Sequence, residues 1–413
     1  MPCEVFMPQH IQLNFPDAAE TTQKSGFAHW PVWACGFRPF FLGGAIVAAI
    51  SIALWLVVFF GGHSAGGAAG PIGWHAHEMI FGFTPAIIAG FLLTAVPKWT
   101  RVPTPTGPLL AALFGLWLAG RLAMMLAGII PYGLAAAIDF IFLPGLAVAI
   151  AIPIIRAKTP RNLGFIPLLF GLAAANGLFH LSHLGLLDGW ATRGLDAGLA
   201  IIIVIIAIVG GRVIPFFTTN KLGRPAIDRR RIIDIVAVGA SVAWLFAFII
   251  ASASPFAGIA AIVAGAANLA RMIRWHSLAS VKVPLLWILH LGYAFVGIGL
   301  VALGFATLDI TASRTIAIHA LTTGAIGLLC LGMMSRVALG HTGRQLKAAR
   351  ITTAAFVILS MAAALRVFLP WLIPAAYSTS IMVSGILWTV AWGLFLVVYV
   401  PILVKPRVDG RPG

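Results

Sequence analysis

Histidines within long apolar segments are the residues of this chain whose type and spacing could do chemistry. An ionisable side chain in an apolar segment costs free energy, so each one needs a partner or a function. Imidazole nitrogens bind haem iron, copper and non-haem iron, and they also form hydrogen bonds between packed helices. Both interpretations apply to His75, His77, His180, His183, His290 and His319.

His180 and His183 lie three residues apart, so both imidazoles would project from one face of a helix. No acidic neighbour is expected for either, which favours neutral imidazoles that can bind a metal. Together with His75 from another helix they would make an open three-coordinate site, in which we expect copper. The alternative is a structural role at the helix end. His290 lies too far from this end to join the cluster, and it either serves a second cofactor or only packs.

Glu78 follows His77 directly and is the clearest acidic residue in the first turns of an apolar segment. It would orient a ligand histidine by accepting the second N–H of the ring, as oxygen atoms often do beside metal-bound imidazoles, or it would relay protons. The alternative is a carboxylate that the positive end of a helix dipole favours. We therefore predict Glu78 as a catalytic residue.

The composition indicates that these residues belong to a membrane protein. Of 413 residues, 61% are hydrophobic and 9% are charged, whereas about a quarter are charged in a soluble domain. The net charge of +16 does not indicate nucleic acid, because Lys and Arg lie in short loops rather than on one aqueous face. Cys3, Cys35 and Cys330 are far apart, which predicts neither a disulfide framework nor a thiolate metal site.

Apolar runs long enough to cross a bilayer recur along the whole chain. A helix needs about 20 residues for this, and residues 1–36 contain no apolar core of a signal peptide. We therefore predict an all-α polytopic membrane protein, with a cytoplasmic segment over 1–36, a twelve-helix domain over 37–404 and a cytoplasmic tail over 405–413. The predicted spans are 40–60, 74–96, 107–128, 133–155, 163–187, 195–215, 232–252, 255–272, 284–305, 314–336, 351–371 and 378–404.

The basic residues indicate the orientation of these spans. With the N-terminus inside, nearly all of the 27 Lys and Arg residues fall on the cytoplasmic side, and the positive-inside rule then places both termini there. A wrong number of spans would scramble this asymmetry, so the charges independently support twelve. The exceptions near the outer face are Arg121, Arg193, Arg314 and Arg366.

The spans repeat in groups of four. Segments 37–42, 165–170 and 282–287 each have proline in third position followed by large apolar residues, at a spacing of about 120 residues. Segments 95–100 and 213–218 close the second and sixth spans with a proline in the same position. We predict three four-helix units that are parallel around an axis along the membrane normal. The alternative is the general preference of proline for helix starts, repeated by chance.

Two histidines occupy matching positions under this repeat. His77 lies 20 residues before Pro97, and His319 lies 20 residues before Leu339, which aligns with Pro97 in the third unit. Residues at equal depth around one axis are suitable axial ligands of one haem. We therefore predict haem ligation by His319 and a histidine of the second span, His77 being the matching one. No C-x-x-C-H motif is present, so we expect haem b.

Arg212 and Arg336 also match under the repeat, because segment 335–339 resembles segment 211–215. Arginines in such positions could pair with the anionic groups of a cofactor, and we predict both as cofactor-binding residues. The alternative is that both arginines follow the positive-inside rule, because they lie at the cytoplasmic ends of spans.

Several longer segments are shared with a known family. They are the Trp-His-Ala-His-Glu-Met run at 74–79, the Ala-Gly-Phe-Leu-Leu-Thr-Ala-Val-Pro run at 89–97, and segments 37–41, 211–217 and 319–324. On these residues the chain resembles the NnrS family, membrane proteins associated with nitric oxide metabolism and tolerance in denitrifying and related bacteria. The resemblance covers most of the chain. It implies haem and copper as cofactors, nitric oxide as the partner and the bacterial inner membrane as the location.

The arrangement is also similar, more distantly, to that of haem-copper oxidases. Those proteins have twelve spans in a pseudo-threefold array and hold a low-spin haem by histidines on the second and tenth spans, which His77 and His319 match. Their copper pattern is not matched, because the predicted sixth, seventh and eighth spans contain no histidine. Oxygen reduction is therefore not expected.

We thus expect an integral membrane protein that holds haem b and copper and that reduces or binds nitric oxide, with a quinol or another donor supplying electrons. The rival class is a transporter, in which the outer histidines would bind a metal or small ion transiently. Transporters often have broken spans, and the Gly-Phe-Thr-Pro run at 82–85 would serve as one. The visible absorption spectrum of the purified protein distinguishes the two classes.

Overall fold

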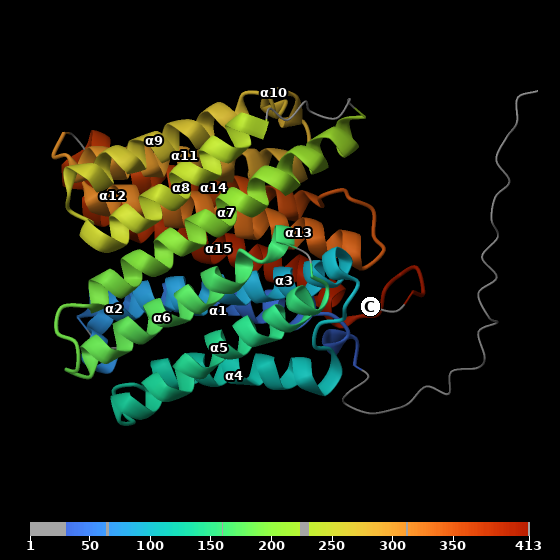
Figure 1. Ribbon diagram of the computed structural model, residues 1–413, viewed down its shortest axis with the longest axis horizontal. Helices are drawn as coiled ribbons and strands as arrows, with labels where there is room; N and C mark the ends of the chain where they lie inside the picture. The colour runs from blue at the N-terminus through green and yellow to red at the C-terminus, as the bar shows by residue number, and fades with distance from the viewer. Residues whose placement is uncertain (1–29, 63–65, 159, 224–230, 311–312, 412–413) are drawn as a thin grey trace, which may run out of the picture.

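The computed structural model describes residues 30–62, 66–158, 160–223, 231–310 and 313–411. Within these ranges the chain is helical and has no strand, and twelve of its helical stretches are long and apolar enough to cross a membrane. The all-α class and the twelve predicted spans are therefore confirmed. Residues 1–29 of the predicted N-terminal segment lie outside the described residues. The long helices run side by side as one bundle (Figure 1).

The twelve spans form three successive units of four, and some spans consist of several helical segments. The first unit contains α1 (Phe37–Gly61), α2 (Gly70–His77), η4 (Glu78–Phe83), α3 (Thr84–Thr100), α4 (Gly107–Met125) and α5 (Tyr132–Arg156). The second contains α6 (Phe165–His183), α7 (Ala191–Leu222), α8 (Arg231–Ala251) and α9 (Pro255–Met272). The third contains α11 (Pro284–Thr307), α12 (Arg314–His319), η6 (Ala320–Gly327), α13 (Leu328–His341), α14 (Arg350–Leu372) and α15 (Tyr377–Val404). Short helices in the connections are η2 (Pro31–Trp33), η3 (Gly67–Ala69), η5 (Pro160–Asn162), α10 (Ser277–Ser280) and η7 (Pro374–Ala376).

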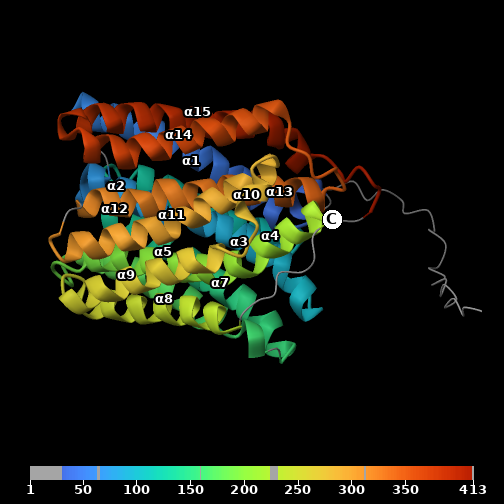
Figure 2. The same cartoon turned by 90° about the horizontal axis from the view of Figure 1, so that it is seen from above.

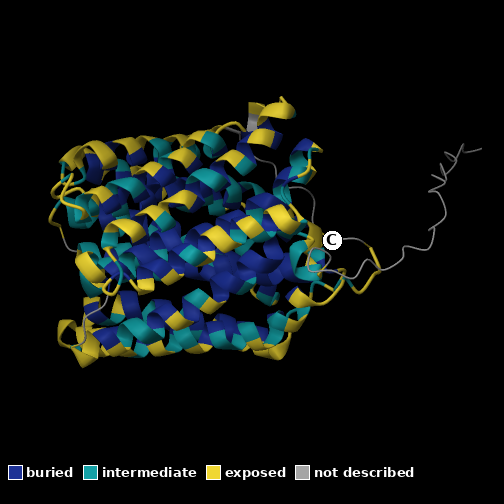
Figure 3. Cartoon of the chain, turned by 90° about the horizontal axis from the view of Figure 1, so that it is seen from below, coloured by how far each residue is buried: buried dark blue, intermediate teal, exposed yellow. Residues whose placement is uncertain are grey.

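The packing of the helices agrees with three parallel units. The last span of each unit packs against the first span of the next: α5 on α6, α9 on α11, and α15 on α1. The last of these contacts closes the ring (Figure 2). The second span of each unit is among the most buried, and the buried residues concentrate in the interior of the bundle (Figure 3).

Two spans change their helix type directly after a histidine. The second span continues from His77 into the π-helical segment η4, and the tenth continues from His319 into the π-helical segment η6. The matching span of the second unit, α7, stays α-helical and has Leu195 at the aligned position. Since π-helical segments are rare and frequently lie at functional sites, their matched positions support the alignment of the first and third units.

The sixth span is longer than predicted. The sequence indicates a span over 195–215 that closes at its proline, whereas α7 covers Ala191–Leu222. Proline has a φ compatible with a helix, and it removes a single backbone N–H from the hydrogen-bond pattern. The helix therefore continues past Pro215 for two further turns.

Arg38 joins the first helix of the bundle to the last. Its side chain is fully buried, and Nη1 donates hydrogen bonds to the carbonyl oxygens of Leu403 and Lys405, each at 2.8 Å. Carbonyl groups at the C-terminal end of a helix lack partners within it. Arg38 therefore caps α15, and the described start of the chain and its C-terminal end lie at the same end of the bundle.

Candidate metal centre and axial cavity

A buried arginine holds two carboxylates of neighbouring spans. Arg121 on α4 donates from Nη1 to Glu78 Oε1 at 2.7 Å and from Nη2 to Asp139 Oδ1 on α5. All three residues are at most 4% exposed, and removing one partner of such a buried ion pair is strongly destabilising. Gly82 in η4 leaves space for the guanidinium, because a Cβ at this position would overlap it.

His77 packs directly against this ion pair and has no exposed surface. Its Nδ1 lies 3.1 Å from Glu78 Oε1, and its Nε2 lies 3.0 Å from Asn176 Oδ1 and 3.3 Å from Asp139 Oδ2. All of these partner atoms are acceptors. Protons on both ring nitrogens would satisfy them, and so would one N–H at Nδ1 together with a metal ion between Nε2 and the carboxylate.

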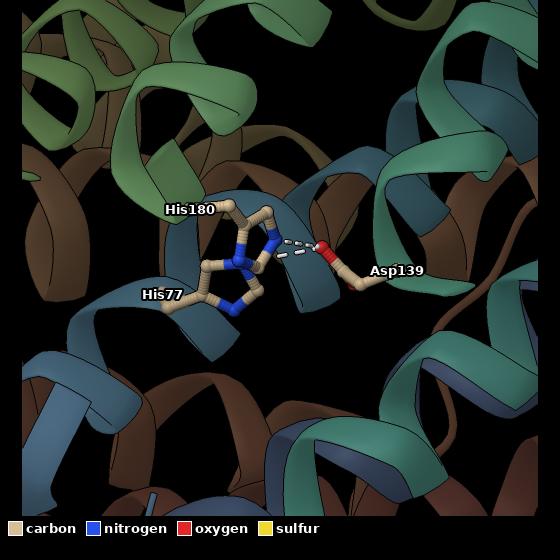
Figure 4. A group of neighbouring side chains, drawn as sticks. All are labelled: His77, Asp139 and His180. Atoms are coloured by element: carbon tan, nitrogen blue, oxygen red, sulfur yellow. Dashed lines mark hydrogen bonds and ion pairs between the residues drawn. The ribbon is translucent and has the colours of Figure 1, made fainter. Parts of the chain in front are cut away.

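His180 on α6 reaches the same carboxylate from another direction. Its Nε2 lies 2.9 Å from Asp139 Oδ2, and its Nδ1 lies 3.1 Å from the hydroxyl oxygen of Tyr132. The Nε2 atoms of His77 and His180 therefore converge on one oxygen atom (Figure 4). Within the described residues, His77, Asp139 and His180 form a group whose ligand atoms all lie within 4.8 Å of one another, and such a group could hold a metal ion.

A cavity lies between the second spans of the three units, where the predicted axis of the repeat runs. This axial cavity has a volume of about 260 Å³ and is also lined by α1, α14 and α15. Its lining is mostly apolar, with a few polar side chains. The ionisable ones are His75, His319, Arg366 and the ion pair of Asp196 with Arg314, in which the nitrogen and oxygen atoms lie 2.6 Å apart.

The two histidines of the axial cavity differ in the partners of their ring nitrogens. His319 Nδ1 donates to the carbonyl oxygen of Thr315 at 2.7 Å, so Nε2 is the unprotonated nitrogen, and it accepts a hydrogen bond from Arg366 Nη2 at 3.4 Å. His75 stacks on Trp55 with ring centroids 4.5 Å apart, and its buried Nδ1 has no hydrogen-bond partner among the described residues. An imidazole whose other nitrogen donates to an oxygen atom is the usual form of a metal ligand.

The second-span histidine that shares the cavity with His319 is His75 and not His77. Residues two positions apart in an α-helix point about 200° apart, because each residue turns the helix by about 100°. His75 therefore faces the axis of the repeat, and His77 faces α5 and α6. Joint ligation of one haem by His77 and His319 stays a prediction, and the structure places the two on different sites.

Arg366 on α14 corresponds to Arg121 on α4, since each lies on the third span of its unit beside the second-span histidine. Arg121 has two carboxylate partners. Arg366 is 5% exposed, its Nη1 has no hydrogen-bond partner among the described residues, and none of the ion pairs in the described part of the chain includes it. The axial cavity thus has a buried positive charge directed toward it.

A second cavity of about 100 Å³ continues from the first between the same spans and α11. Thr84 and Ile326 line both cavities, and the rest of the second lining is almost entirely Ile, Leu, Val, Phe and Met side chains. A charged molecule would lose its hydration there without compensation. A small uncharged molecule fits such a space.

The remaining predicted ligands lie apart from these sites. His183 is one turn beyond His180, and its ring packs against Phe179 with centroids 4.6 Å apart. His290 has both ring nitrogens 2.9 Å from hydroxyl oxygens, of Thr218 and Ser277. Metal ligation by His183 and His290 stays a prediction.

The two arginines predicted to bind a cofactor line neither cavity. The guanidinium of Arg336 lies 3.9 Å from the centre of the Phe217 ring, which is a cation–π contact. Arg212 also lies outside both linings. Their cofactor-binding role stays a prediction.

Sequence reasoning missed the partners of these histidines. The expectation that His180 has no acidic neighbour is wrong, because Asp139 approaches it from α5, which is distant in sequence. The available signal was the opposite charges of Arg121 and Asp139 inside consecutive spans, where an ionisable residue usually has a charged partner. Asn176 and Tyr132 gave no comparable signal, since single amides and phenols are common in membrane helices.

A family model described as NnrS protein matches residues 31–407. The match includes all twelve spans, the group around Asp139 and the axial cavity. No match was found among the curated proteins compared with the chain. The extent of the family match shows a membrane protein related to nitric oxide. The chain therefore belongs to the NnrS family.

Proposed function

We propose that this protein holds haem b in the axial cavity and acts there on nitric oxide, either by binding it or by reducing it. The observation that carries the proposal is the presence of His75 and His319, from the second and tenth spans, on one buried cavity. Membership of a family associated with haem, copper and nitric oxide supports it.

The side chains of the axial cavity fit a haem. His319 would bind the iron through Nε2, His75 would bind from the second span, and Arg366 would pair with a propionate carboxylate of the haem. The cavity volume of about 260 Å³ is slightly below the usual range of about 300–1,000 Å³ for small-molecule sites. The haem would therefore take space that flexible side chains such as Arg366 and Met79 now fill.

Bound haem would supply an iron that exchanges one electron, and nitric oxide would bind to it where one of the two histidines gives up its position. The apolar second cavity supports nitric oxide as the ligand, because this molecule is small and uncharged. Reducing two nitric oxide molecules to nitrous oxide and water consumes two electrons and two protons, so a quinol or another donor is part of the reductase form of this proposal. Glu78 holds and orients His77, and Arg121 fixes the Glu78 carboxylate.

The proposal places the protein in the bacterial inner membrane. Most Lys and Arg residues lie toward the end of the bundle where α1 begins and α15 ends, and by the positive-inside rule we assign this end to the cytoplasm. His75 and His319 lie toward the opposite end of their spans, so the axial cavity is on the outer side of the membrane.

The visible absorption spectrum of protein purified after expression with ample haem tests the proposal. We expect the Soret band of a low-spin haem in the wild type, and its loss or conversion to a high-spin form in His319→Ala and in His75→Ala. His290→Ala is the control, because His290 is buried but outside the cavity, and it should keep the wild-type spectrum.

If the wild-type protein shows no Soret band, the proposal is wrong and the transporter alternative is favoured. If His77→Ala loses the low-spin spectrum while His75→Ala keeps it, the pairing predicted from the sequence is correct and the assignment of His75 is wrong.

A further inference from the structure

The polar group between α5 and α6 brings three possible metal-ligand atoms within 4.8 Å of one another, and Asn176 forms hydrogen bonds with two of these residues. His77 Nε2, His180 Nε2 and Asp139 Oδ2 come from the second, fifth and fourth spans, and both nitrogens lie within 3.3 Å of the oxygen. None of these residues is more than 4% exposed. Three spans therefore bring two imidazoles and one carboxylate together without water around them.

The outer nitrogen of each imidazole is also held in place. Nδ1 of His77 lies 3.1 Å from the Glu78 carboxylate, and Nδ1 of His180 lies 3.1 Å from the Tyr132 hydroxyl. Metal-bound histidines almost always have such an oxygen partner on the second nitrogen, which fixes the ring and selects its tautomer.

The fixed charges of the group favour a cation. Glu78 and Asp139 are two carboxylates, and Arg121 is the one guanidinium that pairs with them. The sum is one negative charge in a buried place, where an uncompensated charge costs several kcal/mol. A bound divalent metal ion would pair with this negative charge and leave the group with one net positive charge.

We propose that His77, Asp139 and His180 bind one divalent transition-metal ion at a site separate from the axial cavity. Two imidazoles and a carboxylate suit copper(II) and non-haem iron(II) alike. This inference adds a second metal to the proposed function. It does not depend on haem, so the two can fail separately.

Metal analysis of the purified protein tests the site, with haem iron subtracted by means of the Soret band. We expect one copper or one non-haem iron per chain in the wild type. Metal-depleted protein titrated with Cu(II) should show nitrogen superhyperfine splitting from two imidazoles in its electron paramagnetic resonance spectrum. His180→Gln should lower the affinity for Cu(II) at least about tenfold, since even loss of an outer-shell partner costs about 10- to 100-fold.

His183→Gln is the matched control, because His183 lies on the same helix one turn away and outside the group. It should bind Cu(II) as the wild type does. If His183→Gln and His180→Gln lose the metal equally, or if the wild type has neither copper nor non-haem iron and does not bind added Cu(II), the site is wrongly assigned.

A variant that gains a spectroscopic band tests the site even if the substitution lowers the yield of folded protein. His180→Cys loaded with Co(II) should give a near-ultraviolet thiolate-to-metal charge-transfer band, which appears only when the side chain at this position is a ligand. His183→Cys should not give the band. A Co(II) spectrum of folded His180→Cys protein without this band would overturn the proposal, whether or not the Soret band shows that haem is bound.

Discussion

Two buried arginines at corresponding positions differ in the charges around them. In the first unit Arg121 pairs with Glu78 and Asp139. In the third unit the position after the histidine is Ala320, and Arg366 has no carboxylate partner among the described residues. The same framework thus pairs the arginine with two carboxylates in one unit and, among the described residues, with none in the other.

Replacing Arg366 should weaken haem binding through its carboxylates. Hydrogen bonds to charged groups contribute about 1.5–3 kcal/mol, so Arg366→Gln should lower the affinity for haem about 10- to 100-fold. Haem dimethyl ester lacks the carboxylates. We expect the wild type to bind it more weakly than haem, and Arg366→Gln to bind both alike, in titrations of haem-free protein followed by the Soret band.

The control is Arg336→Gln, because Arg336 is also predicted from the sequence to bind the cofactor but lies outside the cavity. It should keep the preference for haem over its ester. Equal affinity of the wild type for haem and ester would show that Arg366 does not bind a propionate.

At the scale of helices, the sequence predicts the membrane spans, because they depend on hydropathy. It does not predict which side of a helix a given residue faces. All twelve spans are recognisable because each contains an apolar run of membrane length. The π-helical segments are not predicted, since no residue pattern requires them, and the side of the helix that each histidine faces is not predicted either. This is why the sequence pairs His77 with His319 and the structure brings His75 there.

The π-helical segment η4 should tolerate a methyl group poorly at Gly82. A Cβ there would overlap the Arg121 guanidinium and displace it from Glu78. Overpacking of this kind costs about 1–3 kcal/mol, so Gly82→Ala should lower the melting temperature in detergent and weaken Cu(II) binding.

Gly115→Ala in α4 is the matched control, because nothing lies within 4 Å of the added Cβ. It should be neutral or slightly stabilising, since alanine favours a helix over glycine by about 1 kcal/mol. Equal melting temperatures for the two variants would show that Arg121 can shift without cost.

At the scale of the molecule, the three junctions between units use different contacts. The junction of α5 with α6 contains the polar group, in which Asn176 donates to Asp139 at 2.8 Å. At the junction of α15 with α1, the Trp388 indole donates to the Ala48 carbonyl oxygen at 2.9 Å. At the junction of α9 with α11 the backbones approach closely, and a Cβ at Gly297 would lie 2.9 Å from the Gly265 oxygen. Among the described residues, the group that could hold a metal ion lies at the first of these junctions.

Of the three junctions, the packing of α9 against α11 should be the most sensitive to an increase in side-chain size. Small residues allow membrane helices to pack closely, so Gly297→Val should separate α9 from α11 and lower the yield of monodisperse protein in detergent. Gly393→Val in α15 is the control, because a Cβ there meets nothing within 4 Å. If both variants elute and melt alike, the close approach of α9 and α11 does not hold the second and third units together.

The cap that Arg38 places on α15 has a consequence for biosynthesis. Arg38 enters the membrane early during translation, but its acceptors at Leu403 and Lys405 are added only when the twelfth span is made. Until then the guanidinium lacks these two carbonyl partners and α1 lacks the helix that covers it. A chain that stops before α15 therefore leaves a charged side chain without two of its hydrogen-bond acceptors and α1 without its cover, which quality-control proteases can distinguish from the folded protein.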